Sequence, residues 1–422
     1  MKNFHTQRFV QWRARFSGHV LKRSTAIRFC HFLPVLCAIA TPALCRADEW
    51  TISTSDFHSD TVVLHGFDEH GAAVTTIPSQ NAHTVGLDQF VEISRVIPIT
   101  QRPSRFILRL RDGDLLAGEP VSLKSDSVVW REDVVGNMTV PLSEAISFYR
   151  PDLAQSRVPE TAADDSVKLA NGDTVHGVLS ELGGMAVSIQ PAAGGDATSI
   201  TFGSVSAVEF ASLGQASAPT TSASVSPVPP AFRIHLTDAS VLTAASVHGD
   251  DWTMHLTFAQ GAASDVPLAS IESIEQINGP VVWLSSLSPS ENVQTPFLQA
   301  EYPARFDRSV LGGPIQFGDR VYAHGIGVHA YSRLSWPIDA QHGHFRTQYA
   351  VDGDEPYADL MVQIKLDGQV VHSREGLRAG EISPVVELDL KGKHTVTLEV
   401  IDEQNEGVQA RLDWIEPAFL RQ

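Results

Sequence analysis

Histidines and carboxylates in the C-terminal third of the sequence have spacings that limit the chemistry available to them. His324 and His329 are five residues apart, and His342 and His344 are two apart, which is not the i, i+4 spacing of a helical zinc protease site. The acidic turn at 352–355 offers carboxylate oxygens, which calcium prefers as ligands. We therefore expect no cofactor other than a structural calcium ion on this turn, and an isolated acidic turn is more often only solvated.

Sequence motifs for catalysis are missing. The sequence has no phosphate-binding loop, no G-x-S-x-G nucleophile elbow and no dinucleotide-binding fingerprint. A glycosidase would need paired carboxylates on a scaffold large enough to hold a sugar, and the repeated units described below look too small for that. We expect no catalytic residue and a protein that is not an enzyme, with a hydrolase as the third choice among the functions considered.

The composition favours β structure and argues against anionic partners. The 30 glycines and 24 prolines among 422 residues imply many turns and few long helices. Residues 1–47 carry eight Lys or Arg and no acidic residue, so without them the formal net charge changes from −18 to −26. Because such a chain repels phosphates, nucleic acid and anionic membrane surfaces are not expected partners.

Residues 1–47 are typical of a signal peptide. A basic stretch precedes the apolar run 32–44, which is shorter than the roughly 20 residues needed to span a bilayer. An uncleaved anchor is the alternative. Cys30, Cys37 and Cys45 all lie in this segment, so the predicted mature chain has no disulfide. We expect a secreted, periplasmic or cell-envelope protein with no membrane insertion after cleavage.

A weak internal repeat runs through the middle of the chain. The segment FILRLRDGDLLAGEPVSL from Phe106 aligns with SVKLANGDTVHGVLSEL from Ser166, and FRIHLTDASVLTAASV from Phe232 is a third copy. Alternating apolar residues and Asp-Gly or Asn-Gly pairs predict strand, tight turn and strand. Asp114 and Asp173 are accordingly interpreted as turn formers. Each unit resembles a small Sm-like or SH3-like barrel.

The repeats define the predicted domain boundaries. A shared ending, VGLDQFVEISRV from Val85 and VPLASIESIEQI from Val266, indicates a degenerate leading copy. We expect this degenerate β-module at 48–100, repeats at 101–150, 164–211 and 231–279, and a Pro, Ser and Ala-rich linker at 212–230.

From residue 280 onward, strand-like runs follow one another between turns. In LMVQIKL from Leu360, alternate apolar residues face one side, and Asp367-Gly368 fits a hairpin turn. Several such runs in 280–422 predict an antiparallel β-sandwich of the jelly-roll type. The whole protein is therefore expected to be all-β.

Four motifs in this region resemble those of the NPCBM domain, a carbohydrate-binding-module family related to family 51. They are WLSSLSP from Trp283, RFDRSVLGGPIQFGDRVYAHGIGVHAYSRLSWPI from Arg305, the Asp-Gly pair in KLDGQVV, and LDWIEPAF from Leu412. The resemblance covers 280–422 and implies a galactose-binding-like sandwich, with some members binding galactose-containing glycans. The chain departs from the family where Gly353 separates the acidic residues of the turn.

A sugar site in this domain would need aromatic faces and charged groups that bind hydroxyls. The candidates on predicted loops are Asp307, Arg308, Tyr322, His324, Tyr331, Asp354, Glu355 and Tyr357. His329 and Trp414 are interpreted instead as core residues, a hydrogen-bonded histidine and the anchor of the last strand.

Two functions follow from these observations. The first is an exported, non-catalytic protein that binds glycans, with galactose-containing ones as the first choice. The second is a structural or protein-interaction scaffold of the cell envelope, with envelope proteins as partners, whose sandwich has no sugar site. Fold resemblance alone does not decide between them.

Overall fold

The computed structural model describes residues 49–99, 104–153, 164–192, 194–211, 230–259, 261–298, 300–318, 320–353, 355–402 and 408–421. The predicted signal peptide and most of the predicted linker lie outside these residues. The described chain consists of β-strands and three single-turn 3-10 helices, which confirms the all-β prediction. In this part of the chain, no helix has the length and apolar character needed to cross a membrane.

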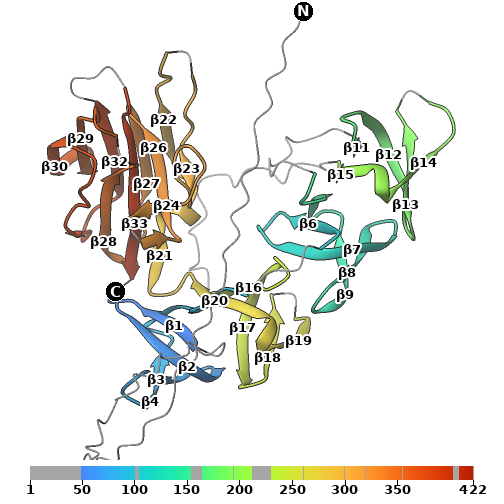
Figure 1. Ribbon diagram of the computed structural model, residues 1–422, viewed down its shortest axis with the longest axis horizontal. Helices are drawn as coiled ribbons and strands as arrows, with labels where there is room; N and C mark the ends of the chain where they lie inside the picture. The colour runs from blue at the N-terminus through green and yellow to red at the C-terminus, as the bar shows by residue number, and fades with distance from the viewer. Residues whose placement is uncertain are drawn as a thin grey trace, which may run out of the picture. The chain divides into compact units, whose positions relative to one another are not determined.

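Four five-stranded modules occupy the first two thirds of the described chain (Figure 1). The leading module contains β1 (Glu49–Thr54), β2 (Ser59–Asp68), β3 (Gly71–Thr76), β4 (Asn81–Gly86) and β5 (Phe90–Arg95). The next contains β6 (Phe106–Leu110), β7 (Leu115–Leu123), β8 (Ser127–Glu132), β9 (Gly136–Pro141) and β10 (Ala145–Tyr149). The third contains β11 (Asp165–Leu169), β12 (Thr174–Gly183), β13 (Ala186–Pro191), β14 (Thr198–Thr201) and β15 (Val205–Glu209). The fourth contains β16 (Ala231–Leu236), β17 (Val241–Asp250), β18 (Thr253–Phe258), β19 (Ala263–Pro267) and β20 (Ile271–Ile277).

All four modules share one strand order. The first four strands form an antiparallel meander, and the fifth strand returns to pair with the first. The predicted turns lie where the repeat placed them, because Gly113 and Gly172 both have a φ of +95° and Ala239 has a φ of +77°. The degenerate leading segment is thus built like the other three modules.

The modules associate in pairs through their fifth strands. In the leading and fourth modules, β5 pairs antiparallel with β20, and Ile93 lies opposite Ile274. In the other two modules, β10 pairs with β15, and Phe148 lies opposite Val208. The chain therefore pairs its outer modules with each other and its inner modules with each other, an arrangement that the repeat pattern does not reveal.

In the outer pair, each module donates side-chain hydrogen bonds to backbone carbonyl oxygens of the other module. The Arg95 guanidinium donates to the carbonyl oxygens of Leu268 and Ile271, at 2.8 and 2.7 Å. The Gln276 amide nitrogen, in the orientation that satisfies its partners, donates to Leu87 and Phe90 at 2.9 and 2.7 Å. These contacts relate the two modules by an approximate twofold axis that passes between Ile93 and Ile274. 

A buried polar network joins the second module to the fourth. Asp114 accepts hydrogen bonds from the backbone N–H and the hydroxyl of Thr243, at 2.9 and 2.7 Å, and is only 6% exposed. Ser240 donates to Glu132 at 2.7 Å and accepts from the backbone N–H of Ala117 at 2.8 Å. The interpretation of Asp114 as only a turn former was therefore incomplete, because its side chain links two modules.

The C-terminal region is a two-sheet sandwich. One sheet has the order β23 (Arg305–Phe306), β26 (Gly325–His329), β33 (Arg411–Arg421), β28 (His342–Val351) and β31 (Val386–Asp389), with β21 (Val281–Trp283) also paired to β33. The other has the order β22 (Glu291–Gln294), β27 (Ser332–Pro337), β32 (Thr395–Asp402), β29 (Leu360–Leu366) and β30 (Gln369–Leu377). Buried residues including Trp336, Phe345 and Trp414 form the core, which confirms the predicted β-sandwich.

A loop and a short hairpin cover the outer face of the first sheet. The hairpin consists of β24 (Ile315–Phe317) and β25 (Arg320–Tyr322), and its Ile315 packs with Ile415 in a small second core. Gly327 lies under this loop, where an added Cβ would be 2.3 Å from the backbone nitrogen of Val310. The glycine allows the loop to lie directly on the strand.

Candidate functional site

The predicted sugar-binding residues that the structure describes have different surroundings. Asp307 and His324 lie together, and Glu355 and Tyr357 lie together on another loop. Tyr331 is bonded on the second sheet, and Asp354 lies outside the described residues. Two further candidates are separate from these groups. Arg308 is exposed and makes a long 3.4 Å contact with the Gly312 carbonyl, whereas Tyr322 is only 6% exposed and packs in the small second core.

His324 connects the sandwich to the repeat modules. Its ring stacks on Trp283, and its Nε2 lies 3.5 Å from Oε1 of Glu275 on β20. Its Nδ1 lies 3.6 Å from Oδ1 of Asp307, and Glu275 is directly opposite Glu92 across the β5–β20 pair. Both ring nitrogens of His324 therefore face carboxylates, and its contact with a sugar stays a prediction.

Burial and like charge govern the ionisation of this group. Burial and the neighbouring carboxylate of Glu275 raise the pKa of Glu92 to about 7. Burial alone would lower the pKa of His324, but the nearby carboxylates of Asp307 and Glu275 outweigh it and raise that pKa. The protonated imidazole is therefore the form that this site favours.

Tyr331 belongs to a charged cluster on the second sheet. Its hydroxyl donates to the Glu399 carboxylate, which also forms an ion pair with Lys365. Glu399 is only 3% exposed. Burial and this bond raise the pKa of Tyr331. The Tyr331 hydroxyl already has a partner, so it is less suited to binding a sugar than its sequence position suggested.

Glu355 and Tyr357 lie at the end of the sandwich where β28 ends and β33 begins. Strand register fixes this end, because His329 pairs with Arg411 and Val351 pairs with Leu412. Glu355 forms an ion pair with Arg411, and the Tyr357 backbone N–H donates to the Gln409 side chain at 3.0 Å. The side chain of Tyr357 remains 64% exposed. The exposed Tyr357 is thus two residues along the loop from a carboxylate that a guanidinium orients.

Two further carboxyl groups lie beneath this ion pair. Asp413 is 2% exposed, and burial together with the nearby Asp352 raises its pKa to about 8, against the opposing effect of Arg411. Burial also raises the pKa of Asp352. Near neutral pH the buried Asp413 is therefore protonated, and it lies beneath the Glu355–Arg411 ion pair.

Sequence reasoning identified Glu355 and Tyr357 but not the residues from neighbouring strands. Arg411 and Asp413 alternate with core residues on β33, and only the cross-strand register shows that they face the 352–359 loop. The interpretation of Trp414 as a core anchor is confirmed, since it is 0% exposed. His329 is 4% exposed and bonded through Nδ1 to its neighbour's carbonyl at 2.6 Å, as predicted for a core histidine.

Within the described residues, no group of three or more His, Cys, Asp or Glu side chains could hold a metal ion. The predicted calcium turn includes Asp354, which lies outside these residues, and so calcium binding stays a prediction.

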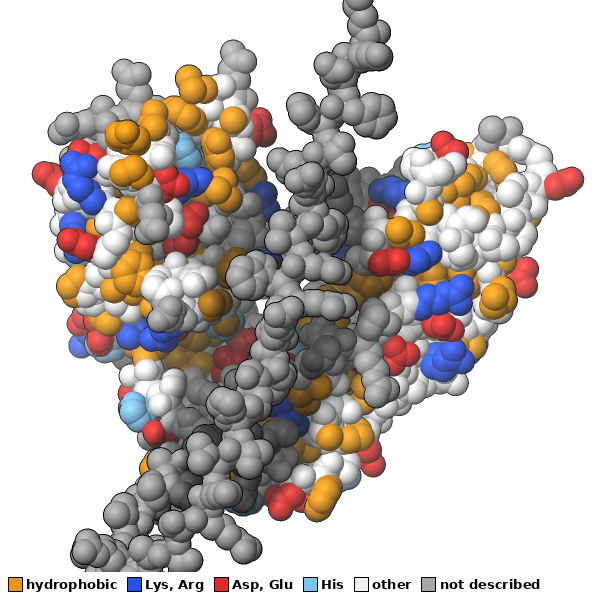
Figure 2. Space-filling model, viewed as in Figure 1, with side chains coloured by type: hydrophobic (Ala, Val, Ile, Leu, Met, Phe, Trp, Pro, Cys, Tyr) orange, Lys and Arg blue, Asp and Glu red, His pale blue; other side chains and the backbone are white. Residues whose placement is uncertain are grey.

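On the described part of the face in Figure 2, acidic and basic side chains are interspersed.

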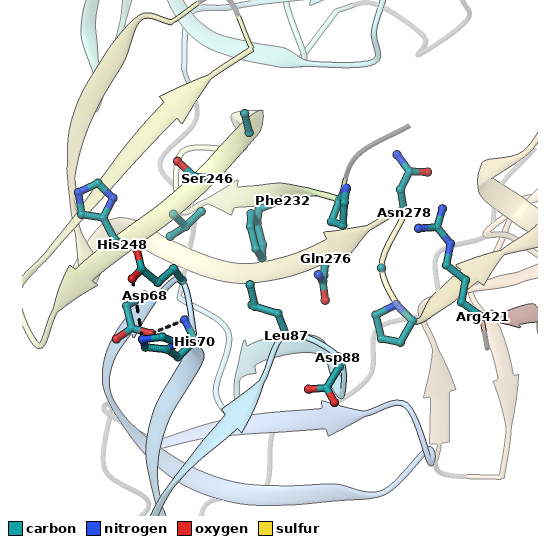
Figure 3. A pocket seen from close by; sticks show the side chains of 16 residues that line it. Asp68, His70, Leu87, Asp88, Phe232, Ser246, His248, Gln276, Asn278 and Arg421 are labelled. Carbon is teal, nitrogen blue, oxygen red and sulfur yellow. Dashed lines mark hydrogen bonds and ion pairs between the residues drawn. The ribbon is translucent and has the colours of Figure 1, made fainter. Parts of the chain in front are cut away.

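A cavity of about 1100 Å³ lies between the leading and fourth modules (Figure 3). Leu87 and Phe232 form apolar walls, and Asp68, His70 and Asp88 lie around them. The His70 backbone N–H donates to Asp68 at 2.7 Å. This cavity is separate from the Tyr357 loop of the sandwich.

Comparison with known proteins assigns the C-terminal sandwich to a family. Residues 280–420 match the model of the NPCBM/NEW2 domain, which confirms the resemblance seen in the sequence. No curated protein matches the chain by sequence.

Solved structures of carbohydrate-binding modules are similar to parts of the chain. One is the CBM51 of a Clostridium perfringens GH95 protein in complex with methyl-galactose, at 21% identity and a TM-score of 0.30, covering 33% of this chain and 99% of that one. Another contains CBM51-2 with GlcNAc and INT domains from Clostridium perfringens ZmpB, at 18% identity and a TM-score of 0.31, covering 42% of this chain and 37% of that one. A third contains the tandem CBM51 modules of a Streptococcus pneumoniae family 98 glycoside hydrolase, at 13% identity and a TM-score of 0.30, covering 61% and 88%.

Proposed function

Starting from an NPCBM/NEW2 domain at residues 280–420, we propose that the chain is an exported, non-catalytic protein that binds glycans through its C-terminal sandwich. Galactose-containing glycans are the proposed ligands, since the family resemblance implies them. The observation that carries the proposal is the exposed Tyr357, two residues along the loop from Glu355 of the Glu355–Arg411 ion pair. This combination suits a sugar, which has an apolar C–H face and a rim of hydroxyl groups.

Each group has a defined task in this proposal. The Tyr357 ring packs against the C–H face of the sugar, where apolar contact favours binding. Glu355 accepts hydrogen bonds from hydroxyls and Arg411 donates to them, and charge-assisted bonds of this kind are stronger than neutral ones. The ion pair holds both side chains before the ligand arrives, so less conformational entropy is lost on binding.

The absence of catalysis is supported by the same geometry. Hydrolysis of a glycoside needs one carboxyl group to protonate the leaving oxygen and another to act on the opposite side of the sugar. Here Glu355 is neutralised by Arg411, and Asp413 is only 2% exposed, beneath the loop. Export is supported by the basic and apolar pattern of residues 1–47.

The test is calorimetric titration of the full chain with methyl galactoside, lactose and a wider glycan panel. Binding that Tyr357→Ala weakens by about tenfold or more, a change of about 1.4 kcal/mol, would support the proposal. Val370→Ala is the matched control, since Val370 is 49% exposed elsewhere on the sandwich and should leave binding unchanged.

A folded chain that binds no member of the panel would refute the proposal. The envelope scaffold would then become the better hypothesis, and recovery of one defined envelope protein by the immobilised chain would be its test. A chain that binds a sugar equally well with Tyr357 removed would place the sugar site elsewhere in the protein.

A further inference from the structure

Trp252 is a large apolar side chain that the fold leaves in solvent. It is 79% exposed, whereas each of the other five tryptophans in the described residues is at most 7% exposed. It lies at the tip of the β17–β18 hairpin in the fourth module, outside the NPCBM/NEW2 domain, which begins at residue 280.

The backbone beneath this indole is held firmly. The Asp250 side chain accepts hydrogen bonds from the backbone N–H groups of Trp252 and Thr253, at 2.9 and 3.0 Å. The Trp252 carbonyl accepts a third from the backbone N–H of Leu268 at 2.8 Å. A ring on a fixed turn can meet a ligand with little loss of backbone entropy.

A cavity of about 470 Å³ lies beside the indole, at the junction with the leading module. Trp50, Leu64 and Leu268 supply apolar walls. Its polar groups include Asp251 and His65, whose Oδ1 and Nδ1 atoms are 3.6 Å apart and whose side chains are about half exposed. The volume is in the range of small-molecule sites, and a few polar groups among apolar walls are typical of them.

The approximate twofold axis of the module pair provides an internal comparison. It relates this cavity to the one in Figure 3, where Phe232 takes the place of Trp50 and Leu87 that of Leu268. In the Figure 3 cavity, His70 occupies the turn position that Trp252 has here. In the two remaining modules this turn position holds Asp126 and Met185. Because a different residue occupies this turn position in each of the four modules, the fold does not require tryptophan there.

We infer that Trp252, Asp251 and His65 form a second saccharide-binding site, separate from the sandwich, which takes one or two neutral pyranose rings. The indole packs on the C–H face of a ring. The Asp251 carboxylate accepts from one hydroxyl, and His65, whose Nε2 lies 2.9 Å from the Thr75 hydroxyl, bonds to the adjacent one through Nδ1. A chain with two such sites would bind polysaccharides more tightly than either site alone.

A saccharide fits this site better than a peptide does. Peptides often bind by adding a strand to an open sheet edge. The wall strand β2 is already paired on both sides, with β1 and β3, and its end also pairs with β17. The indole, the carboxylate and the imidazole therefore offer side-chain contacts, which suit a compact ligand with hydroxyl groups.

The test is affinity electrophoresis of the full chain in gels containing galactan, mannan, β-glucan or soluble chitin fragments. The background variant is Tyr357→Ala, so that the proposed sandwich site does not contribute to retention. Retention in at least one gel is expected, with Trp252→Ala weakening the interaction by about tenfold or more and Asp251→Asn weakening it to a smaller extent. Met185→Ala is the matched control, because Met185 is 72% exposed at the equivalent turn of another module.

Fluorescence provides the second readout, because Trp252 is the exposed indole among those described. The retaining polysaccharide should shift the emission to shorter wavelength and reduce iodide quenching, and both changes should be lost in Trp252→Phe. Equal retention of the Trp252→Ala and Met185→Ala chains, or no retention in any gel, would overturn the inference. Loss of retention in Tyr357→Ala alone would leave the sandwich proposal intact and refute this one.

Discussion

The imidazole of His324 lies flat on the indole of Trp283, with ring centroids 4.4 Å apart and ring planes at 11°. Trp283 is only 7% exposed and also meets Phe57 of the leading module edge to face, at 6.0 Å. The first strand of the sandwich thus carries an aromatic anchor that positions a titratable ring between the carboxylates of Glu92, Glu275 and Asp307.

This arrangement predicts that the protein loses stability as the pH rises through neutrality. The raised pKa of His324 means that its contribution is fully present below about 6.5 and is lost as the pH passes its folded value. Glu92, whose pKa is about 7 when folded against an ordinary 4.5, lowers stability progressively as the pH rises from about 4.5 to about 7. Both effects act in the same direction, at up to about 1.4 kcal/mol per pH unit for each group.

Urea denaturation of the wild type and of His324→Gln at pH 5.5 and pH 8 checks this prediction. The variant should be the less stable of the two at pH 5.5, and the difference should shrink at pH 8. His58→Gln is the control, since the His58 side chain is 68% exposed. A wild type and variant that differ by the same amount at both pH values would show that His324 does not titrate in this range.

Asp413 gives a second pH-dependent prediction, located in the sandwich. Asp413 has a pKa of about 8 in the folded chain, against an ordinary value of 3.8. As the pH rises, the unfolded chain therefore loses this proton at a lower pH than the folded chain does. Wild-type stability should therefore fall, relative to Asp413→Asn, as the pH rises from about 4 to about 8, at up to about 1.4 kcal/mol per pH unit. Thermal denaturation of both proteins across this range, with exposed Glu375→Gln as the control, measures the difference. Parallel curves would contradict the raised pKa.

Gly327 should not tolerate a side chain. A Cβ there would lie 2.3 Å from the nitrogen of Val310 and 2.5 Å from the carbonyl carbon of Ser309, and backbone atoms cannot move aside easily. We expect Gly327→Ala to destabilise the protein by about 1–3 kcal/mol, as overpacking does in general. Gly313→Ala in the same loop is the control, because its nearest contact would be an ordinary 3.6 Å. Equal denaturation midpoints for the two variants would show that the loop does not lie on the strand.

Ser240→Ala should weaken the link between the second and fourth modules. Ser240 is 0% exposed, and the change leaves Glu132 and the Ala117 N–H each without one partner. A loss of about 1–3 kcal/mol is expected for each buried group left unsatisfied. Denaturation of the full chain gives the value, with exposed Ser199→Ala as the comparison. A loss no greater than that of Ser199→Ala would mean that water or a neighbour replaces the hydroxyl.

The sequence could predict elements whose pattern is local. Alternation in LMVQIKL placed Leu360, Val362 and Ile364 on the buried face, where all three are 0% exposed. The repeat spacing located the turns at Gly113 and Gly172 because a positive φ favours glycine. It also indicated the leading module from only a short shared ending.

The candidate site was only partly visible in the sequence. Glu355 and Tyr357 share one loop, so their neighbourhood could be predicted, but Arg411 lies more than fifty residues away on β33. His324 and Tyr331 were both candidates on predicted loops, and their partners lie on different strands, β20 and β32 respectively. The prediction of a loop does not show to which sheet the loop belongs or at which end of the sandwich it lies.

The strands, the turns, the repeat and the family of the last domain could be predicted from the sequence, because these depend on residues close together in the chain. The pairing of β5 with β20 and of β10 with β15 became visible only in the folded structure, because four similar edge strands could pair in several ways. Side chains such as Arg95 and Gln276, which reach specific carbonyls of the other module, stabilise this choice. Long-range pairing of the outer modules also set Trp252 and Asp251 beside His65, and the pairing of β28 with β33 set Glu355 beside Arg411.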